Sequence, residues 1–104
     1  LTRNTRPIAL RTLEVCGLAD AFDPAWVLGR DEAPAKPDPG GLRHLLGAWG
    51  AVPEDGVFVG DYLYDLQAGR AAGMMTVHVA RGMAQAWPEW TDVRVERLDA
   101  LLPL

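Results

Sequence analysis

The sequence predicts an α/β fold with a parallel sheet, and three observations point to it. Short apolar runs at 26–28, 57–59 and 76–79 have the length of buried strands. Helix signals occupy the stretches 38–49 and 63–72 between them, and glycines or prolines separate the segments. Strands that alternate with helices form βα units, which build parallel sheets.

The first third of the chain predicts a helix, a short strand and a loop. The helix covers 5–16, with Pro7 in its first turn and Gly17 at its end. The apolar strand 26–28 stops at Gly29, and the polar, proline-containing run 30–37 is a loop.

The clearest helix signal follows that loop. Asp38 can cap a helix and Pro39 suits its first turn, while Gly50 can end it. The apolar face has the helical spacing i, i+3, i+4 and i+7, at Leu42, Leu45, Leu46 and Trp49.

The remaining segments complete the alternation. A turn at 53–56 leads into the strand 57–59 and Gly60, the helix 63–72 ends at Gly73, and the strand 76–79 follows. Residues 81–90 are irregular, and their two tryptophans, Trp87 and Trp90, are expected to pack over the sheet edge. The end, 92–104, is expected to hold a short strand and a last helical turn.

Size and charge exclude several classes of protein. A chain of 104 residues allows one small domain, and a net charge of −4 without a basic cluster argues against a nucleic-acid partner. Apolar runs are too short for a membrane span. Cys16 is the only cysteine, so an intrachain disulfide is impossible and a cytoplasmic location is the simplest expectation.

Three loops carry groups that suit a phosphate and a hard cation. In open parallel sheets, ligands bind beyond the carboxyl ends of the strands, on loops that lead into helices. Loop 1–4 carries the hydroxyl of Thr2, loop 35–39 the ammonium of Lys36, and loop 60–65 the carboxylates of Asp61 and Asp65. Hydroxyl and amide groups bind phosphate oxygens, lysine neutralises charge, and carboxylates hold Mg²⁺.

These loops resemble, in order and spacing, the motifs of the haloacid dehalogenase-like (HAD) hydrolase superfamily, in its phosphoglycolate phosphatase-like branch. The segment from Val59 through Gly60 and Asp61 to Asp65 is similar to the family's acidic magnesium motif. Residues 36–39 resemble its lysine motif, and residues 1–4 its threonine motif. The resemblance covers most of the chain between residues 1 and 79.

The resemblance implies a role for each of these residues. Thr2 and the amide of Arg3 would bind the phosphate, and Lys36 would stabilise the nucleophile and the transferring phosphoryl group. Asp61 would ligate Mg²⁺, while Asp65 would orient either Lys36 or the water on the metal. Lys36 is the only lysine beside nine arginines, which favours a specific need for a compact ammonium.

The sequence departs from the family at the nucleophile. Family members carry a nucleophilic aspartate and a second aspartate in a DxD motif on a central strand, with a cap domain after it, and residues 1–104 contain neither. We therefore expect 1–104 to be the C-terminal part of a Rossmann-like, three-layer core domain, inactive by itself. Strands 57–59 and 76–79 should pair in parallel, whereas 26–28 should stand off from 57–59. Contact with the missing N-terminal part or self-association would fill the gap.

The implied activity is that of a Mg²⁺-dependent phosphohydrolase that cleaves a small phosphorylated metabolite through an aspartyl-phosphate. Two alternatives remain open. A phosphoacceptor signalling domain of flavodoxin-like type also combines aspartate, threonine and lysine, although it needs its lysine later in the chain. A non-catalytic interaction module on the same fold is the other. In that case Asp61 and Asp65 would serve only as helix-start residues and Lys36 as a solvated loop residue.

Overall fold

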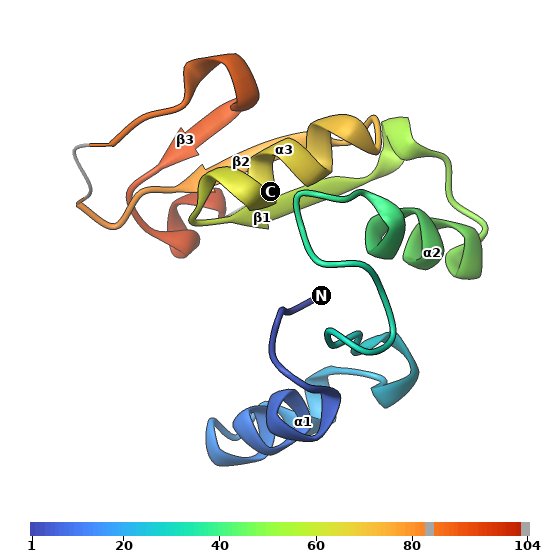
Figure 1. The fold of residues 1–104 in the computed structure, drawn as a ribbon. Coiled ribbons are helices and arrows are strands. Elements are labelled where there is room, and N and C mark those ends of the chain that lie inside the picture. Colours follow the sequence, from blue (N-terminus) through green and yellow to red (C-terminus); the bar gives the residue numbers. More distant parts are fainter. Residues whose placement is uncertain (83–84, 103–104) are drawn as a thin grey trace.

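The computed structural model describes residues 1–82 and 85–102, and it has an α/β fold with a three-stranded parallel sheet (Figure 1). The strands are β1 (Val57–Gly60), β2 (Met75–Val79) and β3 (Val93–Val95), in the spatial order β1-β2-β3. The predicted fold class is confirmed.

The parallel pairing expected between the two central apolar runs is also confirmed. Val57 lies opposite Met75 and Gly60 opposite His78 in the β1–β2 register. β3 continues the sheet beside β2, with Val77 opposite Val93, so the short strand expected near the end of the chain is present. Among the described residues, β1 has a strand neighbour on one side only.

The core forms where helices α2 (Gly40–Trp49) and α3 (Leu63–Ala71) meet the sheet. Gly69 on α3 permits this close approach, because a Cβ there would come within 2.8 Å of the Thr76 methyl on β2 and 3.2 Å of Phe58 on β1. Burial of apolar side chains is the main stabilising contribution to this contact. The buried cluster consists of Leu42, Leu46, Ala68, Ala72 and Met74.

The start and the end of α2 follow the expected signals with a small shift. The Asp38 carboxylate accepts a hydrogen bond from the Gly40 amide (2.7 Å), although the capping position itself is occupied by Pro39. Gly50 ends the helix with a φ of 65°, which glycine adopts without a steric penalty. Trp49, expected on the buried face, is instead 52% exposed and meets Trp26 edge to face.

The expected strand 26–28 is wrong. Pro24 begins a 3-10 turn, Pro24–Trp26, and the Asp23 carboxylate caps that turn by accepting from the Ala25 amide (2.9 Å). Val27 is extended, and both Val27 and Leu28 are buried, as the apolar run predicted. In the described part of the chain this segment has no strand partner, and its backbone makes isolated bonds such as Thr2 N–H to Leu28 C=O (2.9 Å).

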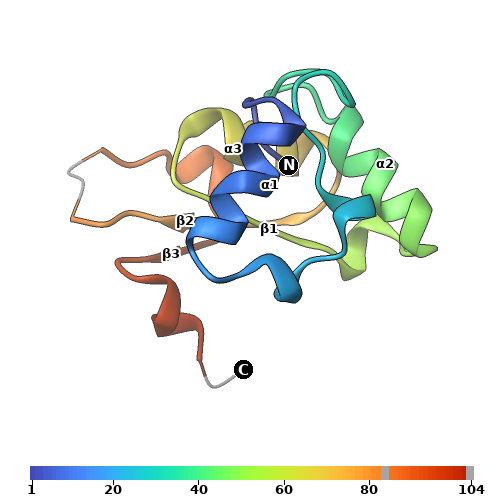
Figure 2. The ribbon, with the colours of Figure 1, turned by 90° about the horizontal axis from the view of Figure 1, so that it is seen from below.

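Helix α1 (Arg6–Val15) lies apart from the sheet, below it in Figure 1. The Arg6 guanidinium holds the helix to the 24–28 segment by donating to the carbonyls of Pro24 (2.7 Å) and Val27 (3.2 Å). Seen from below, α1 crosses in front of the sheet (Figure 2). The predicted helix 5–16 is confirmed to within one residue at each end.

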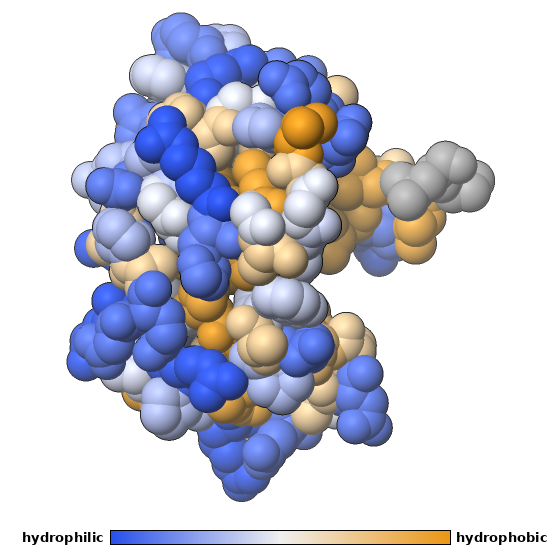
Figure 3. Space-filling view, turned by 90° about the vertical axis from the view of Figure 1, so that its right-hand side faces the viewer, coloured by the Kyte–Doolittle hydropathy of each residue, from blue (hydrophilic) through white to orange (hydrophobic). Residues whose placement is uncertain are grey.

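A cavity of about 530 Å³ separates this part of the chain from β1. Its apolar lining comes from α1, α2 and β1, including Leu13, Leu46 and Phe58. On the face shown in Figure 3 the surface is hollowed between the upper and lower parts of the molecule, and apolar side chains show in the hollow. Residues 26–28 are thus not paired with β1, as expected, and the cavity lies between them.

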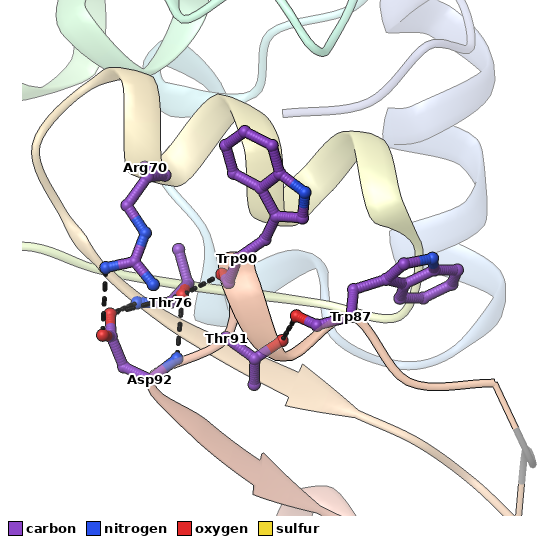
Figure 4. Close-up of polar contacts among 6 residues, drawn as sticks. All are labelled: Arg70, Thr76, Trp87, Trp90, Thr91 and Asp92. Atoms are coloured by element: carbon purple, nitrogen blue, oxygen red, sulfur yellow. Dashed lines mark hydrogen bonds and ion pairs between the residues drawn. The ribbon is translucent and has the colours of Figure 1, made fainter.

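Thr76 and Asp92 join β2 to the segment that precedes β3 (Figure 4). The Asp92 carboxylate accepts from the Thr76 amide (2.8 Å) and from the Arg70 guanidinium of α3 (3.0 Å). The Thr76 hydroxyl donates to the carbonyl of Trp90 (2.6 Å). These bonds hold the segment that contains Trp90 and Asp92 against β2 and α3. Trp90 lies over α3 in Figure 4.

The remaining elements are single 3-10 turns, at Ala19–Ala21, Pro53–Asp55, Pro88–Trp90 and Leu98–Leu101. The last of these is the helical turn expected near the end of the chain. In the parts that the structure describes, no helix combines the length and the hydropathy that a membrane crossing requires.

Candidate active site

The centre of the candidate site is an ion pair between Lys36 and Asp65. The Lys36 ammonium lies 2.5 Å from Asp65 Oδ1, although the residues are 29 positions apart in the chain. Both side chains are largely buried, with 13% and 11% of their surfaces exposed. Two of the residues that the sequence singled out are therefore in direct contact.

Asp65 is held from a second side by the loop after β1. Its Oδ2 accepts from the amides of Asp61 and Tyr62, at 3.2 Å each. Asp65 is in the first turn of α3, where the positive end of the helix dipole also stabilises a carboxylate. The same carboxylate thus orders the 60–65 loop and fixes the position of Lys36.

Gly60 makes this arrangement sterically possible. A Cβ at position 60 would collide with the Cβ and the carboxylate of Asp65. The strand therefore has to end in glycine for the Asp65 side chain to fold back beneath the loop. The sequence signal was present, since glycine closes the apolar run 57–59, but its steric reason is visible only in the structure.

Asp61 presents a free carboxylate beside this pair. Residue 61 is exposed, and in the described residues its carboxylate makes no hydrogen bond or ion pair. Mg²⁺ is often held by one or two carboxylates together with water and substrate phosphate, so one free carboxylate fits such an ion. Within 1–82 and 85–102 there is no cluster of three acidic, histidine or cysteine side chains that would form a complete metal cage.

Asp65 differs from Asp61 because both of its oxygens already have partners. Oδ1 faces Lys36, and Oδ2 faces two amides. Of the two roles that the resemblance leaves open for Asp65, orientation of Lys36 agrees better with these contacts than a place next to the metal does.

Thr2 and Arg3 belong to the first loop. The Thr2 hydroxyl accepts from the Asn4 amide (3.1 Å), which leaves its own hydrogen available to a ligand. Gly29 allows the loop to cross the 27–30 segment closely, since a Cβ there would lie 2.5 Å from the Arg6 amide nitrogen and 2.7 Å from the Asn4 carbonyl. The Arg3 guanidinium lies 5.8 Å from the centre of the Tyr64 ring.

Contacts of the first loop place it near the other two loops. Leu1 packs against the core at the start of α2, where a Cβ at Gly41 would lie 2.7 Å from a Leu1 methyl carbon. The Arg3 guanidinium lies over the ring of Tyr64, the residue before Asp65. Because Lys36 contacts Asp65, the three loops are neighbours in the structure.

Sequence reasoning missed a row of rings along the same edge. Tyr64 meets Tyr62 edge to face (centroids 5.3 Å apart), Tyr62 meets Trp87 (5.6 Å), and Trp87 meets His78 (5.1 Å). Trp87 thus packs at the sheet edge as expected, through His78, but it also reaches the loop of Asp61. Tyrosines at two of the three positions between Asp61 and Asp65 were the available signal.

The parallel α/β sheet, the buried Lys36–Asp65 pair and the free carboxylate of Asp61 agree with the class of hydrolase that the motifs resemble. The chain matches the family model of haloacid dehalogenase-like hydrolases over residues 1–73, and it belongs to that family.

Relatives and a solved structure agree with this assignment. The chain is 37% identical to a phosphoglycolate phosphatase of Pseudomonas putida, in a match covering 75% of this chain and 30% of the relative. It is 33% identical to the pyrophosphatase PpaX of Listeria monocytogenes, with 91% and 45% covered. The crystal structure of a HAD phosphatase from Thermococcus onnurineus superposes with a TM-score of 0.74 at 30% identity, covering 86% of this chain and 41% of that one. The chain thus spans less than half the length of these proteins.

Proposed function

We propose that this chain supplies the threonine, lysine and acidic loops of a phosphohydrolase that acts on a small phosphorylated metabolite. The relatives named as phosphatases and as a pyrophosphatase support phosphate-ester or phosphoanhydride hydrolysis. The observation that carries the proposal is the buried Lys36–Asp65 pair, with the contacts of Leu1 and Arg3 from the first loop nearby and the free carboxylate of Asp61 beside it. The family match favours a hydrolase over the phosphoacceptor alternative.

Each residue has a defined task in this proposal. The Thr2 hydroxyl and the Arg3 amide donate hydrogen bonds to phosphoryl oxygens, and Lys36 neutralises negative charge on the attacking carboxylate and the transferring group. Asp65 keeps the Lys36 ammonium in place through the contact at 2.5 Å. Asp61 is the ligand for Mg²⁺, which when bound supplies positive charge to the phosphoryl oxygens.

The nucleophile of the proposed reaction is an aspartate outside residues 1–104, which forms an aspartyl-phosphate. We propose that 1–104 is the C-terminal part of a core domain and that a further strand lies between β1 and the 1–4 segment. The free side of β1 and the apolar cavity of about 530 Å³ support this placement. The N-terminal part is then the partner of this surface, and self-association is the outcome when that part is absent. A reducing cytoplasm suits the single cysteine.

A phosphatase assay on the longer protein that carries this chain tests the proposal. With generic phosphate esters, turnover is expected to require added Mg²⁺ and to fall about 10²–10³-fold in Lys36→Met, the usual effect of removing one transition-state donor. Arg43→Met, on the exposed face of α2, is the matched control and should leave turnover unchanged. Full activity in Lys36→Met, or no activity with any ester, would leave the interaction module as the better interpretation.

A further inference from the structure

The row of rings from Tyr64 through Tyr62 to Trp87 is continuous with the candidate phosphate site. Tyr62 directly follows Asp61, and its amide donates to Asp65. At the other end of the pair, Tyr64 lies beneath the guanidinium of Arg3, next to Thr2. The row therefore runs along the edge at which a phosphate between Thr2, Lys36 and Asp61 would be bound.

The row of rings is buried at the His78 end and exposed to solvent at the Tyr64 end. His78 is completely buried, and among the described residues neither of its ring nitrogens has a hydrogen-bond partner. Trp87 is half-buried against it. By contrast, Tyr62 is 52% exposed and Tyr64 38% exposed. Packing alone explains the buried end, but it leaves two large rings in solvent directly beside the site.

The contact geometry leaves ring surface available to a ligand. Tyr62 and Tyr64 are almost perpendicular (89°), so the edge of one ring meets the face of the other, and both residues keep exposed surface beside their contacts with Trp87 and Arg3. Arg3 adds a planar cation that can stack on aromatic rings and attract anions. Such a surface suits a flat aromatic group that carries a negative charge close by.

We infer that Tyr62 and Tyr64 form the subsite for the organic part of the substrate, and that this part is a flat aromatic ring, either a simple aryl group or a nucleobase. The phosphate would lie at Lys36 and the ring against the two tyrosines, with Arg3 beside them. This inference rests on the proposed function, because it assigns the leaving group of the same phosphate site.

Calorimetric titration of the longer protein that carries this chain, with its nucleophilic aspartate replaced by asparagine so that esters are not hydrolysed, tests the inference in the presence of Mg²⁺. The ligands are inorganic phosphate, glycerol phosphate, phenyl phosphate, a nucleoside 5′-monophosphate and the nucleoside without phosphate. Phenyl phosphate or the nucleotide should bind about tenfold more tightly than glycerol phosphate, the order of magnitude of one aromatic stacking contact. Comparison of these two aromatic ligands distinguishes an aryl from a nucleobase preference.

Variants separate the rings from the phosphate site. Tyr64→Ala should remove the preference for the aromatic ligand and keep phosphate binding, whereas Tyr64→Phe should keep both. Trp49→Leu, which changes an exposed ring on α2 (52%, against 38% for Tyr64), should change neither. Thermal unfolding of each variant shows whether it is folded.

Different results would overturn the aromatic subsite and the proposed phosphohydrolase function. Equal affinity for phenyl phosphate, the nucleotide and glycerol phosphate overturns the aromatic subsite and leaves the proposed function intact. Binding of the free nucleoside as tightly as the nucleotide also overturns it, because the rings would then act independently of the phosphate. No binding of any phosphate overturns the proposed function, and the subsite fails with it.

Discussion

The Lys36 ammonium and the Asp65 carboxylate form a contact of 2.5 Å with little exposure to solvent, and this contact joins the loop before α2 to the first turn of α3. Removing one partner of a buried pair leaves the other charge without compensation. Asp65 also holds two amides, whereas Lys36 has no second ionic partner among the described residues. Removing Asp65 is therefore expected to lower the free energy of unfolding more than removing Lys36.

The first prediction follows from this asymmetry. Asp65→Ala should destabilise the chain more than Lys36→Met, because it leaves a buried ammonium and two amides without an acceptor. We expect a loss of about 3–5 kcal/mol for Asp65→Ala. Urea denaturation of both single variants and the double variant gives the coupling energy, expected at about 0.5–3 kcal/mol. Strictly additive effects would mean that the pair is not formed in solution.

The second prediction concerns Gly60. Gly60→Ala places a methyl group into the Asp65 carboxylate, so either the strand or the ion pair has to shift. We expect a loss of about 1–3 kcal/mol from this overpacking. The matched control is Gly47→Ala on α2, where an added Cβ has no neighbour within 4 Å and the helix should gain about 0.5–1 kcal/mol. Equal effects of the two changes on the urea midpoint would contradict the steric role of Gly60.

The third prediction is a pH dependence that originates at Asp92. The hydrogen bond from the Thr76 amide holds the pKa of Asp92 below its ordinary value of 3.8; desolvation opposes this shift, and Arg70 lowers the pKa further. Because the folded-state pKa is depressed, the ionised carboxylate stabilises the fold above pH 3.8. This stabilisation is lost as the pH falls through the folded-state value.

Asp92→Asn tests that dependence. The variant should be less stable than the parent near neutral pH, and the difference should shrink as the pH falls below about 3.8, where the unfolded parent becomes protonated first and the folded state follows at lower pH. Thermal unfolding between pH 7 and pH 3 gives the comparison. Asp99→Asn is the control, since the Asp99 side chain is 62% exposed and pairs only with Arg97 among the described residues. A difference that grows on acidification would reverse the sign assigned to Asp92.

Much of the fold could be predicted from local patterns. The order of βα units follows from short apolar runs and helix signals, and glycines such as Gly50 and Gly73 end helices for local conformational reasons. The loops of the candidate site follow from that order, because parallel strands bring their carboxyl ends to the same edge.

Features that depend on tertiary contacts could not be read in this way. The run 26–28 has the composition of a strand, but whether it becomes one depends on a neighbour for its backbone, and here Asp23 and Pro24 fold its start into a turn. The edge-to-face contact of Tyr62 with Trp87 joins distant parts of the chain, and the sequence did not predict it. The contact of Lys36 with Asp65 was one of two roles that the family resemblance implied for Asp65, and the residues alone did not choose between them.

The last prediction concerns the free side of β1. Val57 and Val59 are 52% and 38% exposed, and the cavity of about 530 Å³ extends from β1 to α1. A strand that is paired on one side only, beside an apolar cavity, offers both backbone hydrogen-bonding groups and apolar surface to a further strand. The chain alone should therefore bind an apolar fluorescent dye such as ANS, and the amides of β1 should exchange with solvent faster than those of β2, which is paired on both sides. In the longer protein that carries this chain, a strand in the cavity should abolish dye binding and slow the exchange of β1.

Two charged substitutions test whether the dye binds in the cavity. Val57→Asp puts a carboxylate at the cavity wall and should reduce dye binding severalfold, because an ionised group in an apolar site opposes an apolar, anionic ligand. Val52→Asp is matched to it in residue type and in exposure, 52% for both valines, but Val52 does not line the cavity and its substitution should have no such effect. Dye binding that responds equally to the two substitutions would show that the dye reports general exposure of apolar surface. Unchanged exchange of β1 amides in the longer protein would show that no strand pairs with its free side.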